Sequence, residues 1–376
     1  MEGQIRIQGS IETLSIFFTA GIAAGTALCP SDGSADPGTW FMAAGISFDA
    51  AALALAITCR IRSLKESAAW MAALYFTIGI FCACSDSFGT GIRTGSPCFL
   101  KSCAEEFADR CRALISSIPF PHTNSSGLIN ALLTGDKSCL DKSVVTAFRN
   151  SGAAHILALS GLHLGIIYGL LRKVTSVLGN SRAAVAVRSA AVISASAFYT
   201  VACGSGASLT RALLFIIINE ITHLTHRRAK PARVYCTALL IQLTLSPNVI
   251  GTVSFQLSYL AMAGIFFLHP VLKSWFPEGN DRIPPTWISR KMWDAMSLAV
   301  SCQIFTGPAS WFYFGTFPKY FIIANLMALP VTSLLMTSAT ATVALHAAGI
   351  CPQFMISVTD GLAAALIFIT DTIAGI

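Results

Sequence analysis

The chain has 376 residues, of which 54% are hydrophobic and only 11% are charged, and its mean hydropathy is +0.66. This composition excludes an ordinary soluble protein and is typical of a polytopic membrane protein. The formal net charge is +7, with 25 basic and 18 acidic residues. The positions of the basic residues therefore carry information about orientation in the membrane.

Apolar segments of about twenty residues recur along the chain and predict about eleven membrane-spanning helices. We expect them near residues 11–29, 40–59, 68–84, 155–171, 186–202, 208–224, 233–247, 250–269, 294–312, 320–346 and 354–376. The predicted fold class is an all-α, polytopic transmembrane helical bundle. We divide it into N-terminal transmembrane helices at 1–84, an exported polar segment at 85–124, a main transmembrane domain at 125–350 and a last span at 351–376.

Basic residues gather in alternate loops of this predicted bundle. The clusters are Arg60, Arg62 and Lys65; Arg172, Lys173, Arg182 and Arg188; Arg227, Arg228, Lys230 and Arg233; and Lys273, Arg282, Arg290 and Lys291. The loops at 30–39, 203–207 and 313–319 are nearly free of basic residues. Under the positive-inside rule, the clusters and the N-terminus are cytoplasmic. Residues 85–150 and the C-terminus are then expected outside the cytoplasm.

The exported region contains two amphipathic stretches, at 101–117 and 127–149, on either side of a proline-containing break. Their pattern predicts two surface helices that lie over the bundle. Four cysteines share this region, where disulfides can form: Cys98, Cys103, Cys111 and Cys139. The sequence leaves open whether a disulfide forms and which of them would pair. No C-x-x-C pair occurs, so no zinc site is expected.

The span that begins at His155 is unusually polar. The run from His155 to Gly165 contains two histidines, a serine and two glycines among apolar residues. Polar and ionisable groups are costly in hydrocarbon, so such a run indicates a lined cavity, a pore or a site. Gly161 and Gly165 weaken a helix and permit close backbone approach. A broken or re-entrant segment is therefore expected here.

Several segments resemble the signature of the ComEC-type competence family, whose members are inner-membrane channels of natural transformation. The first are Ala131-Leu-Leu-Thr-Gly-Asp136, Phe148-Arg-Asn-Ser-Gly152 and Ser160-Gly-Leu-His163. Further blocks follow in the family's order: Tyr199 to Gly204 with Leu209 to Ala212, Thr244 to Leu260, and Phe312 to Pro330. In one block Pro247-Asn248 reverses the family's Asn-Pro order. The resemblance covers about residues 125–345 and makes 125–350 a competence-family channel domain.

The resemblance implies a non-enzymatic channel that passes single-stranded DNA across the bacterial inner membrane into the cytoplasm. Implied partners are single-stranded DNA, membrane lipid, a periplasmic DNA receptor, and cytoplasmic motor or recombination proteins; a homo-oligomer remains open. No cofactor or metal is expected. Thr134-Gly-Asp-Lys-Ser138 lacks the glycine pattern of a phosphate-binding loop, so energy must come from elsewhere. The chain is expected to lack the metallo-β-lactamase-like domain and the full OB domain of longer relatives.

The polar residues of the family blocks are the candidates for the DNA path. The predicted lining residues are His155, Ser160, Gly161, His163, Arg211, Gln256, Ser258 and Asn325; the predicted motif-supporting residues are Gly135, Asp136, Arg149 and Gly152. Arg211 could meet phosphates or could extend to the membrane interface as an anchor. The other polar side chains could line the path or bond to one another and tie spans together.

Aromatic residues gather at the predicted outer face: Trp311, Phe312, Tyr313, Phe314, Phe317 and Tyr320. They could form an interfacial aromatic belt or stack on bases. Two other functions remain as alternatives. Ser160-Gly161 resembles part of the motif of rhomboid intramembrane serine proteases, although His163 is too close in sequence to act as the partner base. A secondary transporter with broken helices also fits the composition.

Overall fold

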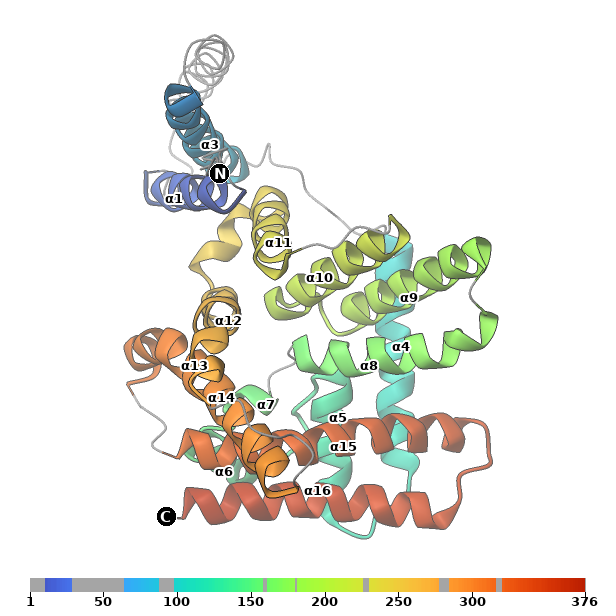
Figure 1. The fold of residues 1–376 in the computed structure, drawn as a ribbon. Helices are drawn as coiled ribbons and strands as arrows, with labels where there is room; N and C mark the ends of the chain where they lie inside the picture. The colour runs from blue at the N-terminus through green and yellow to red at the C-terminus, as the bar shows by residue number, and fades with distance from the viewer. Residues whose placement is uncertain are drawn as a thin grey trace. The chain divides into compact units, whose positions relative to one another are not determined.

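The computed structural model describes residues 11–28, 64–87, 98–157, 161–179, 181–225, 230–276, 284–315 and 320–375. All regular elements in these ranges are helices (Figure 1). They are α1 (Ile11–Leu28), α3 (Leu64–Ser87), α4 (Cys98–Ser117), α5 (Thr123–Thr134), α6 (Lys142–Asn150), α7 (Ala154–Leu157), α8 (Gly161–Thr175), η1 (Ser176–Leu178), α9 (Arg182–Ala202), α10 (Ala207–Leu224), α11 (Pro231–Leu245), η2 (Pro247–Gly251), α12 (Val253–Ala263), η3 (Gly264–Leu268), α13 (His269–Ser274), α14 (Pro284–Phe314), α15 (Phe321–Ala347) and α16 (Gln353–Ala374).

Five of the described helical segments are long and apolar enough to cross a membrane. They are α9, α10, α15, α16 and the continuous stretch Val253–Ser274 formed by α12, η3 and α13. Shorter apolar helices occupy Thr13–Thr26 and Met71–Ala83. The protein is therefore an all-α membrane protein, as predicted. The count of about eleven spans and the cytoplasmic N-terminus stay predictions, and the span expected at 40–59 lies outside the described residues.

The helices form two compact units. The first comprises Met1–Gly95 and Ile221–Phe255, and the second comprises Ser96–Glu220 and Gln256–Ile376. In the first unit, α1 packs against α3 and α11. The α1–α3 contact is close because glycines occupy it: a Cβ at Gly21 would lie 2.0 Å from the carbonyl oxygen of Phe76, and a Cβ at Gly79 would lie 2.4 Å from that of Phe18. Small residues at such contacts are typical of helices that associate within membranes.

The second unit is built around α5, which contradicts its predicted place on the surface. Figure 1 shows α4 and α5 running across the direction of α8, α15 and α16. Leu128, Ile129 and Leu132 of α5 are fully buried in a core that also contains residues of α15 and α16. The helix begins and ends with polar residues, but its middle is apolar and lies between other helices. The apolar face that the sequence shows therefore faces protein rather than the membrane surface.

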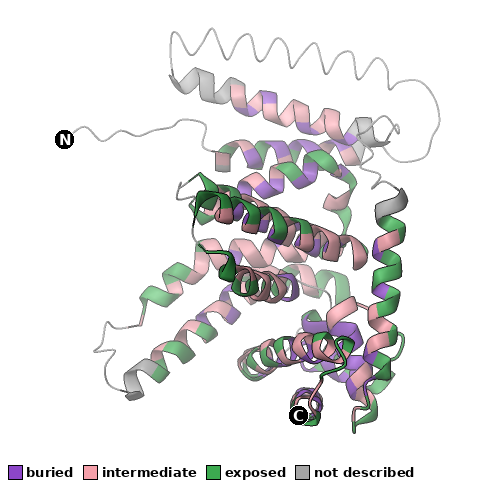
Figure 2. Ribbon diagram, turned by 90° about the vertical axis from the view of Figure 1, so that its right-hand side faces the viewer, coloured by how far each residue is buried: buried purple, intermediate pink, exposed green. Residues whose placement is uncertain are grey.

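The other predicted surface helix, α4, is amphipathic as expected. Ala104, Ala108 and Ile115 are buried along one side of it, while the charged residues on the other side are exposed. Figure 2 shows this alternation of exposed and buried residues throughout the helices. The charged face includes a pair between Arg110 and Glu106 at 2.6 Å. Exposed pairs of this kind contribute little to stability, so burial of the apolar side holds α4 in place.

A buried carboxylate joins the start of α5 to α16. Asp360 of α16 accepts hydrogen bonds from the backbone N–H of His122 at 3.2 Å, from its Nδ1 at 2.6 Å and from the Ser125 hydroxyl at 2.6 Å. A negative charge is favourable at a helix N-terminus, where backbone N–H groups lack partners. Asp360 thus stabilises the first turn of α5 from a position 235 residues away from Ser125.

Candidate functional site

Arg211, near the start of α10, is the most deeply buried cation among the residues that the sequence singled out, with 8% of it exposed. Its Nη1 donates a hydrogen bond to the backbone carbonyl of Ser258 on α12. Its Cζ lies 5.8 Å from the centroid of the Tyr259 ring. A guanidinium at this distance from an aromatic face is attracted by the ring quadrupole. Arg211 therefore links α10 to α12 through both a hydrogen bond and a cation–π contact.

The start of α8 lies against the same guanidinium. A Cβ built on Gly161 would stand 3.2 Å from Nη2 of Arg211 and 3.4 Å from Cβ of Ala212. Glycine at position 161 permits this approach, and any larger residue would press on the arginine. At Gly161 the close neighbour is the Arg211 side chain, whereas a Cβ built on Gly165 would meet nothing within 4 Å, so the close approach expected at both glycines occurs only at the first.

Two further hydrogen bonds extend this arrangement. Ser208 of α10 donates to the hydroxyl of Ser258 at 3.1 Å. The hydroxyl of Tyr313, on α14, donates to Oε1 of Gln256 on α12 at 2.8 Å. Residues of α8, α10, α12 and α14 therefore lie at Arg211 or at the α12 residues beside it, although up to about 150 residues of sequence separate these helices. Each carries one of the blocks that resemble the competence family. We call Gly161, Arg211, Gln256, Ser258 and Tyr259 the Arg211 cluster.

The position of the Arg211 guanidinium bears on the two roles that the sequence leaves open for this residue. An anchoring arginine extends its charged end into water at the membrane interface. Arg211 instead directs its guanidinium to a carbonyl and a ring between helices. In this arrangement α8 and α12 both lie against the guanidinium.

The structure does not bring every predicted lining residue to this cluster. His163 is fully buried on α8. His155 is exposed on α7, where its Nδ1 lies 3.2 Å from the carbonyl oxygen of Gly152. Asn325 lies on α15, and its Oδ1 is buried without a hydrogen-bond partner among the described residues. Ser160 lies outside the described residues. Roles for these four residues in a DNA path stay predictions.

The motif-supporting residues shape the ends of α5 and α6. Gly135 caps α5 with φ at 80°, a left-handed conformation that favours glycine, and its N–H bonds to the carbonyl of Ala131. Asp136 accepts a hydrogen bond from the Ser138 N–H at 2.9 Å, and this bond lowers the pKa of the Asp136 carboxyl. Gly152 has φ at 82° and follows α6, while Arg149 is exposed in the last turn of that helix. Gly135 and Gly152 therefore adopt the left-handed backbone conformation in the turns that follow α5 and α6.

An ionic network in the same unit was missed by the sequence reasoning. Glu220 of α10 is almost completely buried and accepts hydrogen bonds from the hydroxyls of Tyr168 on α8 and Ser189 on α9, each at 2.6 Å. Arg172 lies 3.2 Å from the same carboxylate and donates to the Tyr168 hydroxyl at 2.9 Å. An acidic residue inside the apolar run 208–224 is a signal that could have found it. The network ties α8, α9 and α10 together.

Three of the four cysteines in the region that the sequence predicts to be exported have described side chains, and all three are free thiols. Cys103 and Cys111 are half-buried, Cys139 is exposed, and none of the three forms a disulfide. Burial raises the pKa of the Cys111 thiol. In the described part of the chain, no group of three or more His, Cys, Asp or Glu side chains is arranged to hold a metal ion.

Comparison with known proteins gives the family. The model of the Competence protein family matches residues 132–376. The chain is 29% identical over 136 residues to ComE operon protein 3 of Bacillus subtilis (strain 168), which covers 36% of this chain and 17% of that protein. It is 24% identical over 221 residues to Recombination protein 2 of Haemophilus influenzae, covering 56% of this chain and 27% of that protein.

A third relative, the uncharacterized protein YcaI of Escherichia coli, is 25% identical over 219 residues, which cover 57% of this chain and 28% of that protein. The matches thus span less than a third of the length of each of these relatives. No solved structure gives a significant match. The matched family region contains α8, α10, α12 and α14, the helices that meet around the Arg211 cluster. The chain belongs to the competence protein family.

Proposed function

We propose that the protein is a multi-pass channel of the bacterial inner membrane that passes single-stranded DNA into the cytoplasm during natural transformation. Membership of the competence family gives a role in DNA uptake. The observation that carries the finer proposal is the buried Arg211, on a helix long and apolar enough to cross a membrane. An ionisable residue in such a position is a functional-site hypothesis by default, because its burial is costly.

The chemistry of the Arg211 cluster suits a strand of any sequence. Proteins bind single strands without sequence preference by combining cations for the phosphates with aromatic faces for the bases. Arg211 and Tyr259 supply one of each, 5.8 Å apart. Because the guanidinium bonds to the Ser258 carbonyl, the described arrangement corresponds to a closed path. An arriving phosphate replaces this carbonyl as the acceptor and parts α8 from α12.

The proposed channel is not an enzyme, and the energy for transport comes from a cytoplasmic motor or the membrane potential. A DNA receptor on the outer side and recombination proteins on the inner side are the proposed partners. A channel needs no nucleophile, so Ser160→Ala should retain DNA import. An intramembrane serine protease would lose its activity in the same variant.

The test measures DNA import separately from DNA uptake into the periplasm, in the native host, for Arg211→Lys, Arg211→Gln and Arg211→Glu at matched membrane abundance. Deletion of the gene should abolish transformation and leave periplasmic uptake intact. Import should fall from Lys to Gln to Glu, because Lys keeps the charge and loses only the planar fork. The matched control is Arg182→Gln, since Arg182 is exposed in the same unit.

Equal import by the three Arg211 variants would contradict the proposal, and so would full transformation after deletion of the gene. Loss of import explained entirely by degradation of the Gln and Glu variants would make Arg211 a structural residue. Comparable loss in Arg182→Gln would assign the effect to the total charge of the protein rather than to the Arg211 cluster.

A further inference from the structure

The long apolar stretch Val253–Ser274 is not one uniform helix. Its first part, α12, and its last part, α13, are α-helical, whereas Gly264–Leu268 between them form the π-helical turn η3. A π-turn interrupts the regular ladder of helical hydrogen bonds, and such turns are frequent at bends and at functional sites. η3 begins six residues after Ser258, whose carbonyl accepts from Arg211.

Close contacts hold η3 against two other helices. A Cβ on Gly264 would lie 2.3 Å from the backbone carbonyl oxygen of Ser301 on α14, so only glycine permits this approach. The Phe266 ring stacks on the ring of Phe215 on α10, with their centroids 6.2 Å apart. The turn therefore has a fixed position between α10 and α14, as a pivot requires.

α13, on one side of this turn, is attached to α14 by polar groups. Oδ1 of Asp294 on α14 lies 2.9 Å from Nζ of Lys273 and 3.0 Å from Nε2 of His269. The Trp293 indole donates a hydrogen bond to the carbonyl of Leu272 at 3.0 Å. These contacts follow α13 from its first residue nearly to its last, so α13 and α14 form one fixed pair.

α12, on the other side of the turn, is attached differently, because two hydrogen bonds from α10 meet at one of its residues. Arg211 donates to the Ser258 carbonyl, and Ser208 donates to the Ser258 hydroxyl at 3.1 Å. In the proposed function, an arriving phosphate takes the guanidinium away from this carbonyl. The attachment of α12 to α10 thus depends on the state of Arg211, whereas the contacts of α13 do not involve this residue.

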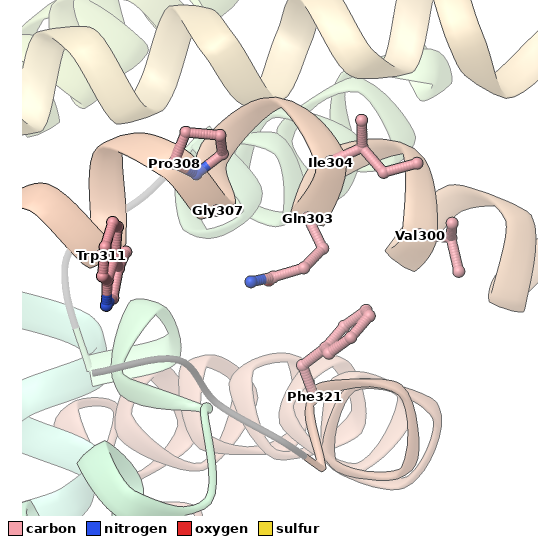
Figure 3. A pocket seen from close by; sticks show the side chains of 7 residues that line it. All are labelled: Val300, Gln303, Ile304, Gly307, Pro308, Trp311 and Phe321. Atoms are coloured by element: carbon pink, nitrogen blue, oxygen red, sulfur yellow. The ribbon is translucent and has the colours of Figure 1, made fainter. Parts of the chain in front are cut away.

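A proline separates the part of α14 that contacts η3 from the part that bonds to α12. Ser301 precedes Pro308, while Tyr313, the donor to Gln256 of α12, follows it. Pro308 lies inside α14, between Ile304 and Trp311 (Figure 3), and it has no N–H to donate. An interior proline weakens and bends a helix. The end of α14 can therefore follow α12 without displacing the segment beside η3.

We propose that η3 is a hinge about which α12 swings away from α10 when Arg211 takes a phosphate, while α13 stays on α14. The inference rests on the proposed channel function and names the part that moves. At 1.5 Å per residue, Ser258 lies about 9 Å along the helix from Gly264. A bend of about 20° at η3 would move it by about 3 Å, which is enough to break a hydrogen bond.

The first test measures hydrogen–deuterium exchange of the unaltered, full-length protein in phosphatidylcholine nanodiscs, with and without a short oligothymidylate. Backbone amides of α12 and η3 should exchange severalfold faster when the oligonucleotide is bound, and those of α13 should not change. Equal acceleration in α12 and α13 would overturn the hinge, because the two helices would then move as one rod. Unchanged exchange in α12 of the DNA-bound protein would overturn it as well.

The second test locks α12 to α10 with a disulfide between Ser208→Cys and Ser258→Cys, whose hydroxyls are 3.1 Å apart. The matched control joins Thr342→Cys to Thr359→Cys, whose hydroxyls lie 2.9 Å apart between α15 and α16. The first disulfide should abolish DNA import in the native host until a reductant is added, and the control disulfide should leave import intact. Import that persists after complete cross-linking of α12 to α10, as measured by mass spectrometry, would exclude the proposed movement.

Failure of the hinge can be told from failure of the channel proposal. If the unaltered protein binds oligothymidylate and Arg211→Gln weakens this binding, but α12 and α13 respond alike in the exchange measurement, only the hinge is wrong. If the unaltered protein does not bind oligothymidylate, the channel proposal itself fails.

Discussion

Replacement of Asp360 by alanine is expected to destabilise the protein more than any other single carboxylate substitution in α16. Asp360 is 3% exposed and accepts three hydrogen bonds from the start of α5. Alanine removes all three acceptor interactions at once. It also removes the negative charge that faces the N-terminal turn of α5.

The magnitude follows from the burial of each donor. The Ser125 hydroxyl is fully buried and would lose its acceptor, which costs about 1–3 kcal/mol. The His122 side chain is 63% exposed, so water replaces much of its bond and the loss there is about 1 kcal/mol. With the cavity left by the side chain, Asp360→Ala should cost about 2–5 kcal/mol. Asp360→Asn keeps an acceptor for Ser125 and should cost less.

The assay is the thermal unfolding midpoint of the full-length protein, purified in one detergent and followed by tryptophan fluorescence. Asp371→Ala is the matched control, because Asp371 is an exposed carboxylate on the same helix. The midpoints should fall in the order Asp371→Ala, Asp360→Asn, Asp360→Ala. Equal midpoints for the two alanine variants would refute the reasoning, since they would show that the contact between α5 and α16 does not depend on this carboxylate.

Three further predictions concern other parts of the chain. A variant that keeps Cys139 as its only cysteine should react with an impermeant maleimide added outside spheroplasts, because Cys139 is exposed and free; labelling only after lysis would reverse the predicted topology. Gly21→Ala should lower the unfolding midpoint, at a cost of about 1–3 kcal/mol, since its Cβ would lie 2.0 Å from the Phe76 carbonyl oxygen. Gly361→Ala, with open space around its Cβ, should leave the midpoint unchanged or raise it, and an equal loss in both variants would contradict the close α1–α3 contact. Asp136→Asn should destabilise the protein at neutral pH, and this effect should disappear below about pH 4. The pKa of the Asp136 carboxyl is lower in the folded than in the unfolded protein. The ionised carboxylate therefore stabilises the fold above the unfolded-state pKa, and this stabilisation is lost as the pH falls through the folded-state pKa. A difference in midpoint that persists unchanged in acid would exclude the carboxylate as its cause.

The transmembrane helices of the second unit were predictable from apolar length alone. The segments expected at 208–224 and 320–346 correspond to Ala207–Leu224 and Phe321–Ala347 in the structure. An uninterrupted apolar run of this length has few alternatives to a membrane helix. The bounds were accurate because polar residues or glycines end each run.

The burial of α5 was not predictable in the same way. Ser125, Asn130 and Thr134 lower the apolar character of this helix, and the local sequence gives no partner for the Ser125 hydroxyl. The acceptor for Ser125 is Asp360, which is distant in sequence. A helix with a polar residue that bonds to a remote side chain, as Ser125 does, looks exposed in the sequence until that side chain is located.

The residues of the candidate site were predictable from the sequence, but their contacts were not. Residue type singled out Arg211, Ser258 and Gly161, since charge, hydroxyls and glycine are unusual in apolar spans. The contacts among these three residues could be identified only from the structure, because the residues lie on different helices. Glu220 was overlooked although it is equally unusual, and its partners Tyr168 and Ser189 also come from separate helices.

The place where the family match begins has a practical consequence. Residue 132 lies inside α5, after Ser125 and Leu128. A protein truncated at the start of the family region would lack the whole of α4 and most of α5. Asp360 would then lose its hydrogen-bond donors together with the helix that covers it, and the apolar surfaces of α15 and α16 that face α5 would be open to solvent. The recognisable family region is thus shorter than the stretch of chain that folds with it, and fragments for biochemical work should begin before Cys98.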